Sequence, residues 1–159
     1  MVSAYQIAAS VPDPELPMVT VADLGILRDV REDGDTVTVI ITPTYSGCPA
    51  LAEIGADLRR QLTRAGYQRV DVRVELAPAW TTDWITAEGH RKLAVAGISP
   101  PGIVPPGRRD GPVLVPLAVR CPSCGSADTR QLARFSATAC KALYRCQACL
   151  EPFEHVKEF

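Results

Sequence analysis

The sequence has no excess of one charge, no long apolar run and few histidines, and each shortage excludes a class of function. Its 17 basic and 18 acidic side chains give a formal net charge of −1, so we expect neither nucleic acid nor an anionic membrane surface as a partner. No run approaches the roughly 20 apolar residues that span a bilayer, and the N-terminus lacks the basic and apolar regions of a signal peptide. We therefore expect a cytoplasmic protein whose partners are proteins or metals.

Only two histidines, His90 and His155, are available as a base or as metal ligands. A thiol enzyme needs a base that reaches its nucleophile, and neither histidine has a partner at ligand spacing. We expect both side chains to be solvated or to pack against other residues. The residues show no independent catalytic constellation, and a stand-alone thiol enzyme stays an unsupported alternative.

The chain is long enough for one main domain and a small module. Its 159 residues, 47% of them hydrophobic, can bury one core of roughly 100 residues. The segment "SPPGIVPPGRRDGPVLVP", residues 99–116, is dense in proline and glycine, which resist regular structure. We predict a main domain at 1–98, a linker at 99–116 and a module at 117–159.

The main domain reads as helix, strand, strand, helix, strand, helix. A weak helix is expected over 3–10, two antiparallel strands flank the Asp33-Gly34 turn, and an apolar stripe predicts a helix over 49–65. The alternation of "VDVRVEL" predicts a half-buried strand with Val70, Val72, Val74 and Leu76 inward. Thr81, Thr82 or Asp83 is expected to cap a last helix that Gly97 closes. This order favours a small α+β sandwich, with a sheet of three or more strands packed on helices.

The cysteines divide into one isolated residue and a C-terminal group, which is not the distribution of a disulfide framework. Two Cys-x-x-Cys pairs, separated by 21 residues, are typical of a zinc ribbon whose ligands are Cys121, Cys124, Cys146 and Cys149. Iron is the alternative ion, since thiolates also bind it. Because protein would fill all four positions, we expect structural Zn²⁺ without catalysis. Cys140 lies outside this spacing and is expected to be a buried bystander.

Cys48 stands alone in "TPTYSGCPALAEI", where an extended run ends and a helical pattern begins. With Pro49 in the first helical position, Cys48 is expected at the N-cap, where unpaired amides and the helix dipole lower the pKa of a thiol. A thiolate attacks electrophiles and binds soft metals. The nearby Thr44 and Ser46 add hydroxyls, and Gly47 permits close approach. The alternative is that Cys48 packs under the start of the helix.

Asp13 and Glu15, held by a rigid proline in "DPE", are either a solvated turn or a source of oxygen ligands. Together, "DPELPMVTVADLGILRDV" and "TPTYSGCPA" resemble the metal–sulfur cluster biosynthetic domain found in SufT and in cytosolic iron–sulfur targeting factors. In that family the cysteine of the G-C-P loop is the functional residue. The resemblance therefore implies that Cys48 transiently holds iron or an iron–sulfur cluster, or forms a thiol adduct with a client, with Asp13, Glu15, Thr44, Ser46 and Gly47 in support.

The segments "PAWTTDWI" and "CKALYRCQACLEPF" extend the resemblance to accessory proteins of the phenylacetyl-CoA epoxidase. It implies a maturation factor that helps to assemble an iron–sulfur cluster or metal centre in the oxygenase and reductase subunits. A scaffold that binds the oxygenase without metal transfer is the main alternative. A nucleic-acid-binding ribbon lacks the basic face that it would need. The sequence leaves open which client is served and whether the chain forms a homo-oligomer.

Overall fold

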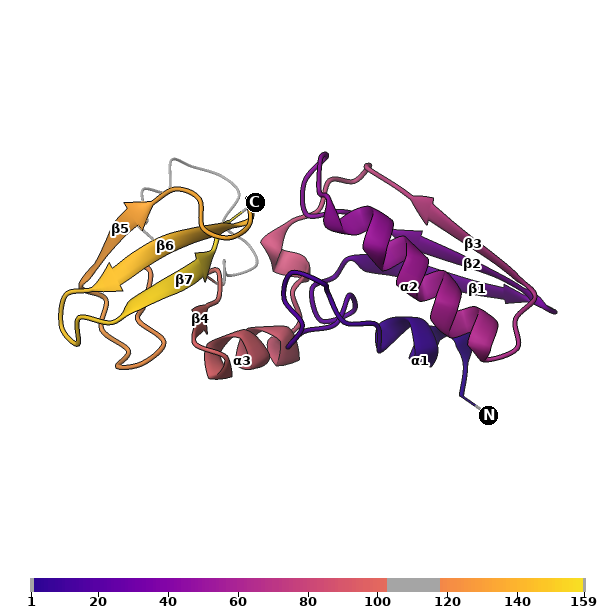
Figure 1. Ribbon diagram of the computed structural model, residues 1–159, viewed down its shortest axis with the longest axis horizontal. Helices are drawn as coiled ribbons and strands as arrows, with labels where there is room; N and C mark the ends of the chain where they lie inside the picture. Colours follow the sequence, from indigo (N-terminus) through magenta and orange to yellow (C-terminus); the bar gives the residue numbers. More distant parts are fainter. Residues whose placement is uncertain (1, 103–117, 159) are drawn as a thin grey trace, which may run out of the picture. The chain divides into compact units, whose positions relative to one another are not determined.

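The computed structural model describes residues 2–102 and 118–158 (Figure 1), and their contacts form two compact units. The first extends to Gly89 and the second runs from His90 to Glu158. This division lies within one helix, earlier than the predicted boundary at residue 98. Of the predicted linker, residues 103–116 lie outside the described residues, whereas Ser99 belongs to a strand.

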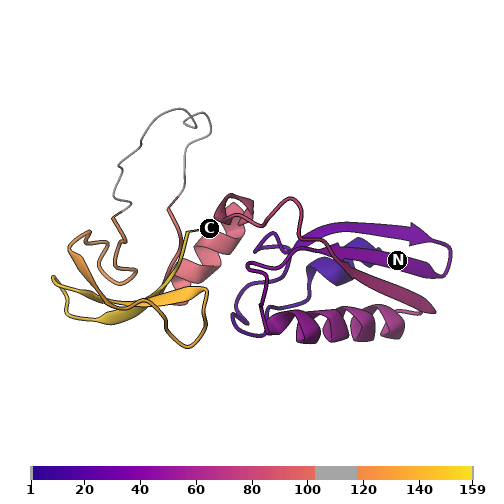
Figure 2. The same cartoon turned by 90° about the horizontal axis from the view of Figure 1, so that it is seen from above.

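The first unit is a three-stranded sheet with two helices. Its strands are β1 (Leu27–Asp33), β2 (Thr36–Ile41) and β3 (Arg69–Val74), and its helices are α1 (Ala4–Ala9) and α2 (Ala50–Arg64). The strand order is β1-β2-β3, with β1 antiparallel and β3 parallel to β2. Helix α2 runs along one face of the sheet (Figure 2), and α1 contacts both β1 and α2. The α+β architecture predicted from the sequence is confirmed.

The core of this unit forms where β2 meets α2. Val37, Val39 and Ile41 have no exposed surface, because β2 is the central strand and its alternate side chains point toward the helices. Leu58 and Leu62, from the apolar stripe of α2, are equally buried. Burying each such side chain contributes about 1.5–3 kcal/mol of stability.

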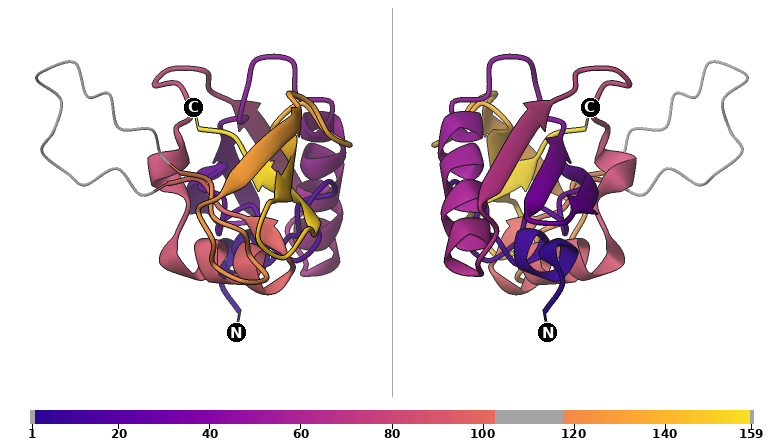
Figure 3. Two further views of the ribbon diagram at one scale, coloured as in Figure 1. Left: turned by 90° about the vertical axis from the view of Figure 1, so that its left-hand side faces the viewer. Right: turned by 90° about the vertical axis from the view of Figure 1, so that its right-hand side faces the viewer.

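The predicted half-buried strand is confirmed as β3, but the expected burial of its inward side chains is wrong at the C-terminal end. Val70 and Val72 are half-buried, but the side chains of Val74 and Leu76 are 49% and 59% exposed. Because β3 is the last strand of the sheet, it has a strand neighbour on one side only (Figure 3, right). The alternation in the sequence identified the strand and its inner face, but not its position at the edge.

The segment after β3 contains two short helices, not one. Thr81 accepts a hydrogen bond from the N–H of Asp83 and caps a 3₁₀ turn, η1 (Thr82–Trp84). A second threonine, Thr86, accepts a bond from the N–H of Gly89 and caps α3 (Ala87–Val95). The predicted cap at residues 81–83 therefore belongs to the 3₁₀ turn.

The second unit contains a four-stranded sheet, of which β5, β6 and β7 are visible in Figure 3 (left). Its strands are β4 (Ile98–Ser99), β5 (Thr129–Ala133), β6 (Lys141–Cys146) and β7 (Pro152–Val156), in the order β4-β7-β6-β5. The antiparallel β5–β6 pair is the hairpin expected of a ribbon. Strands β7 and β4 were not predicted. No helix in the described residues is long and apolar enough to cross a membrane.

Candidate metal centre and thiol loop

Four cysteine sulfurs converge at one end of the second unit. The Cys121 and Cys149 sulfurs lie 3.6 Å apart, and those of Cys124 and Cys146 lie 3.5 Å apart. All four lie within 4.8 Å of one another. A tetrahedral ion with metal–sulfur bonds of about 2.3 Å requires sulfurs about 3.8 Å apart. The four predicted ligands are therefore placed for one tetrahedral ion.

Backbone hydrogen bonds shape the two turns that carry these sulfurs. In the first turn the N–H of Gly125 donates to the Cys121 carbonyl at 2.8 Å. In the second turn the N–H of Cys149 donates to the Cys146 sulfur at 3.4 Å, and Leu150 adopts a positive φ of 67°. Each Cys-x-x-Cys segment therefore folds back on itself, which is what brings its two thiols to one point.

The sulfurs differ in acidity when no ion neutralises them. The N–H of Cys149, together with other donors and against the effect of burial, lowers the pKa of Cys146 to about 6. At Cys149 the N–H of Glu151 acts to lower the pKa of the thiol, but burial and the neighbouring thiols outweigh this and raise the pKa to about 12. At neutral pH the cluster therefore retains protons. A cation that binds all four sulfurs as thiolates must displace these protons.

Cys48 lies in the loop between β2 and α2, but not at the predicted N-cap. Pro49 occupies the N-cap of α2 and has no side-chain hydrogen bond. The Cys48 N–H donates to the Tyr45 carbonyl at 3.2 Å, and its own carbonyl accepts from Leu51 at 3.3 Å. The thiol therefore sits one residue before the cap, because the backbone turns into the helix at Pro49. It is half-buried.

The residues around Cys48 are open. Ser46 and Gly47 are exposed, and Thr44 is half-buried. A Cβ atom added to Gly47 would have Tyr45 Cε2 as its nearest neighbour, at 3.9 Å, which is an ordinary contact. Nothing within the described protein therefore requires glycine at position 47.

The carboxylate of Asp13 stabilises a turn. It is 5% exposed, and its Oδ1 accepts hydrogen bonds from the N–H groups of Glu15 and Leu16, both at 2.9 Å. Glu15 is half-buried. The rigid "DPE" segment thus folds around its own aspartate, a use of this residue that is common in turns.

The Asp23-Leu24-Gly25 turn is held by the segment that carries both tryptophans. The Trp80 indole N–H donates to the Leu24 carbonyl at 2.8 Å, and the N–H of Thr86 donates to the Asp23 carbonyl at 2.9 Å. A Cβ atom at Gly25 would lie 2.5 Å from the Trp84 backbone oxygen. Two segments distant in the sequence, the Asp23-Leu24-Gly25 turn and the segment of both tryptophans, therefore pack together.

A chain of backbone hydrogen bonds connects the Asp13 turn to the Cys48 loop. The Val21 N–H donates to Val11, the Ile26 N–H donates to Val21, and the Thr42 N–H donates to Ile26, each at 2.9 Å. Residue 11 precedes the Asp13 turn, and residue 42 opens the loop of Cys48. The segments that carry the resemblance thus belong to one hydrogen-bonded framework.

His155 and Cys140 are both buried in the second unit. His155 is 3% exposed, its Nδ1 lies 3.1 Å from the Ser99 carbonyl, and its ring packs edge-on against Tyr144. Cys140 is also buried and lies 3.1 Å from the Thr138 hydroxyl. These positions agree with the packing role and the bystander role expected for them.

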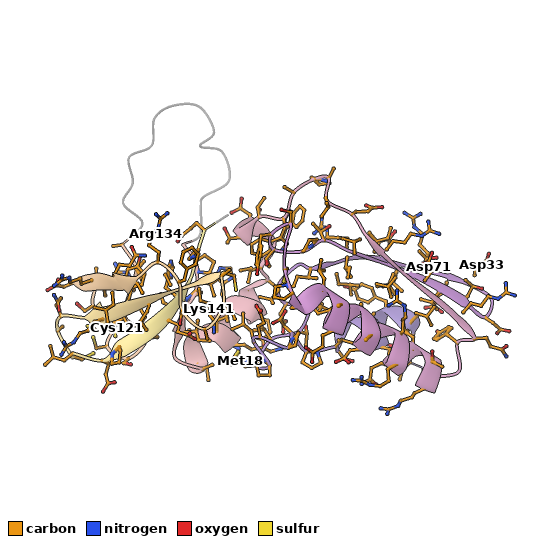
Figure 4. The ribbon with its side chains drawn as sticks, turned by 45° about the horizontal axis from the view of Figure 1, so that its top comes forward. Met18, Asp33, Asp71, Cys121, Arg134 and Lys141 are labelled. Atoms are coloured by element: carbon orange, nitrogen blue, oxygen red, sulfur yellow. The ribbon has the colours of Figure 1, made fainter. Side chains whose placement is uncertain are left out.

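The second sheet contains an ion pair that the sequence did not predict. Lys141, 5% exposed, lies 2.7 Å from Glu154, which also accepts from the Ser136 hydroxyl. Lys141 begins β6 and Cys146 ends it, so the pair lies well away from the metal centre (Figure 4). The only available signal was a lysine beside apolar residues, which does not reveal its partner.

Comparisons with known proteins support this two-part reading. The family described as "Iron-sulfur cluster assembly protein" matches residues 9–76, and the "PaaD zinc beta ribbon domain" matches residues 110–157. The crystal structure of a domain of unknown function, DUF59, from Bacillus anthracis is similar with a TM-score of 0.54 and 26% identity. The match covers 58% of this chain and 89% of that one. Fold and site thus define an iron–sulfur cluster assembly domain joined to a zinc-ribbon module.

One curated relative matches almost the whole chain. It comes from Escherichia coli strain K12, and its name describes it provisionally as a subunit of 1,2-phenylacetyl-CoA epoxidase. The two are 42% identical over 153 residues, which are 96% of this chain and 90% of the relative. The chain belongs to the family of this epoxidase subunit, the PaaD family.

Proposed function

We propose that the chain is an accessory maturation factor of a phenylacetyl-CoA epoxidase and assists the assembly of an iron–sulfur cluster or another metal centre in its oxygenase and reductase subunits. The name of the E. coli relative supports the epoxidase, and the family match over residues 9–76 supports cluster assembly. The observation that carries the proposal is the half-buried Cys48, flanked by exposed Ser46 and Gly47 in a loop of that matched region.

In the proposed mechanism, Cys48 binds the cargo and later releases it to the client. A thiolate is a soft ligand that accepts iron or a cluster. Because the loop around it is open, a client can approach the sulfur without unfolding the domain. Asp13 supports the loop at a distance, since it fixes a turn of the framework that ends at Thr42. Glu15 and Thr44 complete the proposed set of supporting residues.

The second unit has a separate role in this proposal. Its four cysteines hold structural Zn²⁺, and because protein fills every coordination position, the ion has no open site for chemistry. Zinc binding supplies much of the stability of so small a unit. We assign the ribbon to docking the client protein, where a zinc-dependent fold presents a fixed surface.

A scaffold without metal transfer is the second candidate. Among the described residues, the only group of three or more potential metal ligands is the four-cysteine cluster. Cys48 therefore belongs to no such group, and iron bound there needs further ligands from the cargo or from the client. A scaffold would bind the oxygenase through both units and would need no thiol.

Co-expression of the epoxidase subunits with wild type, Cys48→Ala or Cys140→Ala separates these candidates. Cys140→Ala is the matched control, because it removes a buried cysteine that is outside the metal cluster. We expect Cys48→Ala to lower client iron, labile sulfide and turnover at least about tenfold, and Cys140→Ala to leave them within about twofold of wild type.

Normal maturation by Cys48→Ala would refute thiol transfer and support the scaffold. To test for an independent enzyme, single-turnover measurements with thioester and disulfide substrates should show no Cys48-dependent product. A burst of such product would replace the maturation factor with a thiol enzyme.

A further inference from the structure

Strand β3 is the edge of the first sheet. In the order β1-β2-β3, its only strand partner among the described residues is β2. It carries two exposed apolar side chains at one end, Val74 and the following Leu76. An edge strand presents unpaired N–H and C=O groups that can bind another strand, and proteins usually protect such an edge.

The backbone of β3 shows which groups face outward. The N–H of Arg69 donates to the Asp35 carbonyl, and that of Glu75 donates to the Ile41 carbonyl, so the odd-numbered residues direct their backbone groups toward β2. Backbone groups alternate sides along a strand. The N–H and C=O groups of Val70, Val72 and Val74 therefore point away from the sheet.

The side chains of β3 alternate in charge as well as in polarity. Val72 faces α2, where it would contact a Cβ atom built on Gly55, so the odd-numbered side chains lie on the face away from α2. These are Arg69, Asp71, Arg73 and Glu75, whose signs alternate. Asp71, labelled in Figure 4, and Arg73 are exposed and form an ion pair of 2.7 Å within the strand.

This pattern is complementary to itself. If two β3 strands pair antiparallel about a two-fold axis at Val72, Arg69 lies opposite Glu75 and Asp71 lies opposite Arg73. The outward-facing residues then pair with one another, as hydrogen-bonded strands require. A shift by two residues in either direction places Asp71 opposite Asp71 or Arg73 opposite Arg73. Like charges in such positions are destabilising, so the charges select one register.

We propose that β3 pairs with β3 of a second copy of this chain in this register, so that two three-stranded sheets form one six-stranded sheet. The other edge strand, β1, is protected. It contains a bulge between Leu27 and Asp29, a device by which proteins protect sheet edges, and it contacts α1. Within the described residues β3 has no bulge, and its charged side chains face opposite charges in the self-paired register.

This pairing separates the two thiol loops. Strands β2 and β3 are parallel, so the loop that carries Cys48 lies at the end of the sheet where β3 also ends. In an antiparallel pair the corresponding end of the second copy lies at the opposite side. Each Cys48 loop therefore remains open to its own client.

The test is sedimentation of the full chain over a range of concentrations, with folding checked by circular dichroism. Wild type should form a dimer of two 17.1 kDa chains, and salt should weaken it. Arg73→Glu places two like-charged pairs in the interface and should raise the dimer dissociation constant about tenfold or more. The exchange Asp71→Arg with Arg73→Asp keeps opposite charges facing one another and should restore wild-type affinity.

Arg31→Glu is the matched control. Arg31 forms an ion pair with Asp29 at the same 2.7 Å, but on β1. It should leave dimerisation unchanged. A second probe, Val74→Pro, removes an outward N–H without affecting the bonds to β2 and should abolish the dimer.

A wild type that stays monomeric at every concentration overturns the proposal. So does a dimer that Arg73→Glu leaves intact, one that Arg31→Glu disrupts, or a folded exchange variant that fails to dimerise. None of these results depends on client maturation, so the dimer and the proposed function are tested separately.

Discussion

Replacing Gly25 with alanine should destabilise the first unit far more than the same change at Gly34. Both glycines have positive φ, 69° and 56°, and alanine in that region costs about 1–2 kcal/mol. At Gly34 no atom lies within 4 Å of the added Cβ, so this cost is the whole effect. At Gly25 the added Cβ lies 2.5 Å from both the Cβ and the backbone oxygen of Trp84. Displacing these atoms adds about 1–3 kcal/mol, for a total of about 2–5 kcal/mol.

Tryptophan fluorescence during urea unfolding measures this difference directly. Both tryptophans of the chain, Trp80 and Trp84, belong to the first unit, so the signal does not report on the ribbon. We expect Gly25→Ala to lose at least about 1 kcal/mol more free energy of unfolding than Gly34→Ala. Equal losses would show that the Asp23-Leu24-Gly25 turn does not depend on its packing against Trp84, and the steric reasoning would fail.

Two further predictions concern the second unit. Zinc binding at pH 7 should release protons, because the pKa of Cys149 is raised to about 12. Cys146→Ser should weaken zinc binding more than about 100-fold, whereas Cys140→Ser should have no effect. Dye-monitored titration measures both the proton release and the zinc affinity. Burial acts to raise the pKa of Glu154, but hydrogen bonds from Lys141 and Ser136 outweigh it and lower this pKa below 4.5. The ion pair therefore contributes its full stability above pH 4.5, and this stability is lost as the pH falls through the pKa that Glu154 has in the folded protein. Lys141→Met should therefore cost about 3 kcal/mol at pH 7, and pH-dependent denaturation of the zinc-loaded protein should show this cost shrinking in acid; a constant cost would contradict the ion-pair explanation.

Local patterns in the sequence predicted most elements but not their neighbours. The Asp33-Gly34 turn identified the β1–β2 hairpin, and the apolar stripe identified α2, because both signals arise from residues close together in the chain. The parallel pairing of β3 with β2, and of β4 with β7, has no such local signal. The edge position of β3 follows from that pairing, which explains why the exposure of Val74 was not anticipated.

Parts of the site that depend on residues close together in the chain were predictable, and parts that join separate elements were not. Spacing alone identified the four ribbon cysteines, since two residues between cysteines suit a metal-binding turn. The place of Cys48 relative to the start of α2 was predicted to within one residue. The error arose because Pro49, and not Cys48, is the N-cap of the helix. The framework from the Asp13 turn to Thr42, and the pairing of Lys141 with Glu154, join residues from separate elements, and no periodicity in the chain reveals them.

The two proposals together fix how many cargo sites a dimer has. A closed four-cysteine centre cannot accept a further ligand, so cargo binding falls to Cys48, which supplies one sulfur per chain. The β3 pairing places the two Cys48 loops at opposite ends of the six-stranded sheet, too far apart to share one cluster. A dimer should therefore bind two independent cargoes, each completed by ligands from the cargo or the client, with a stoichiometry of one per chain. A single cluster bridging two chains would be incompatible with this pairing, even if Cys48 proved essential for maturation.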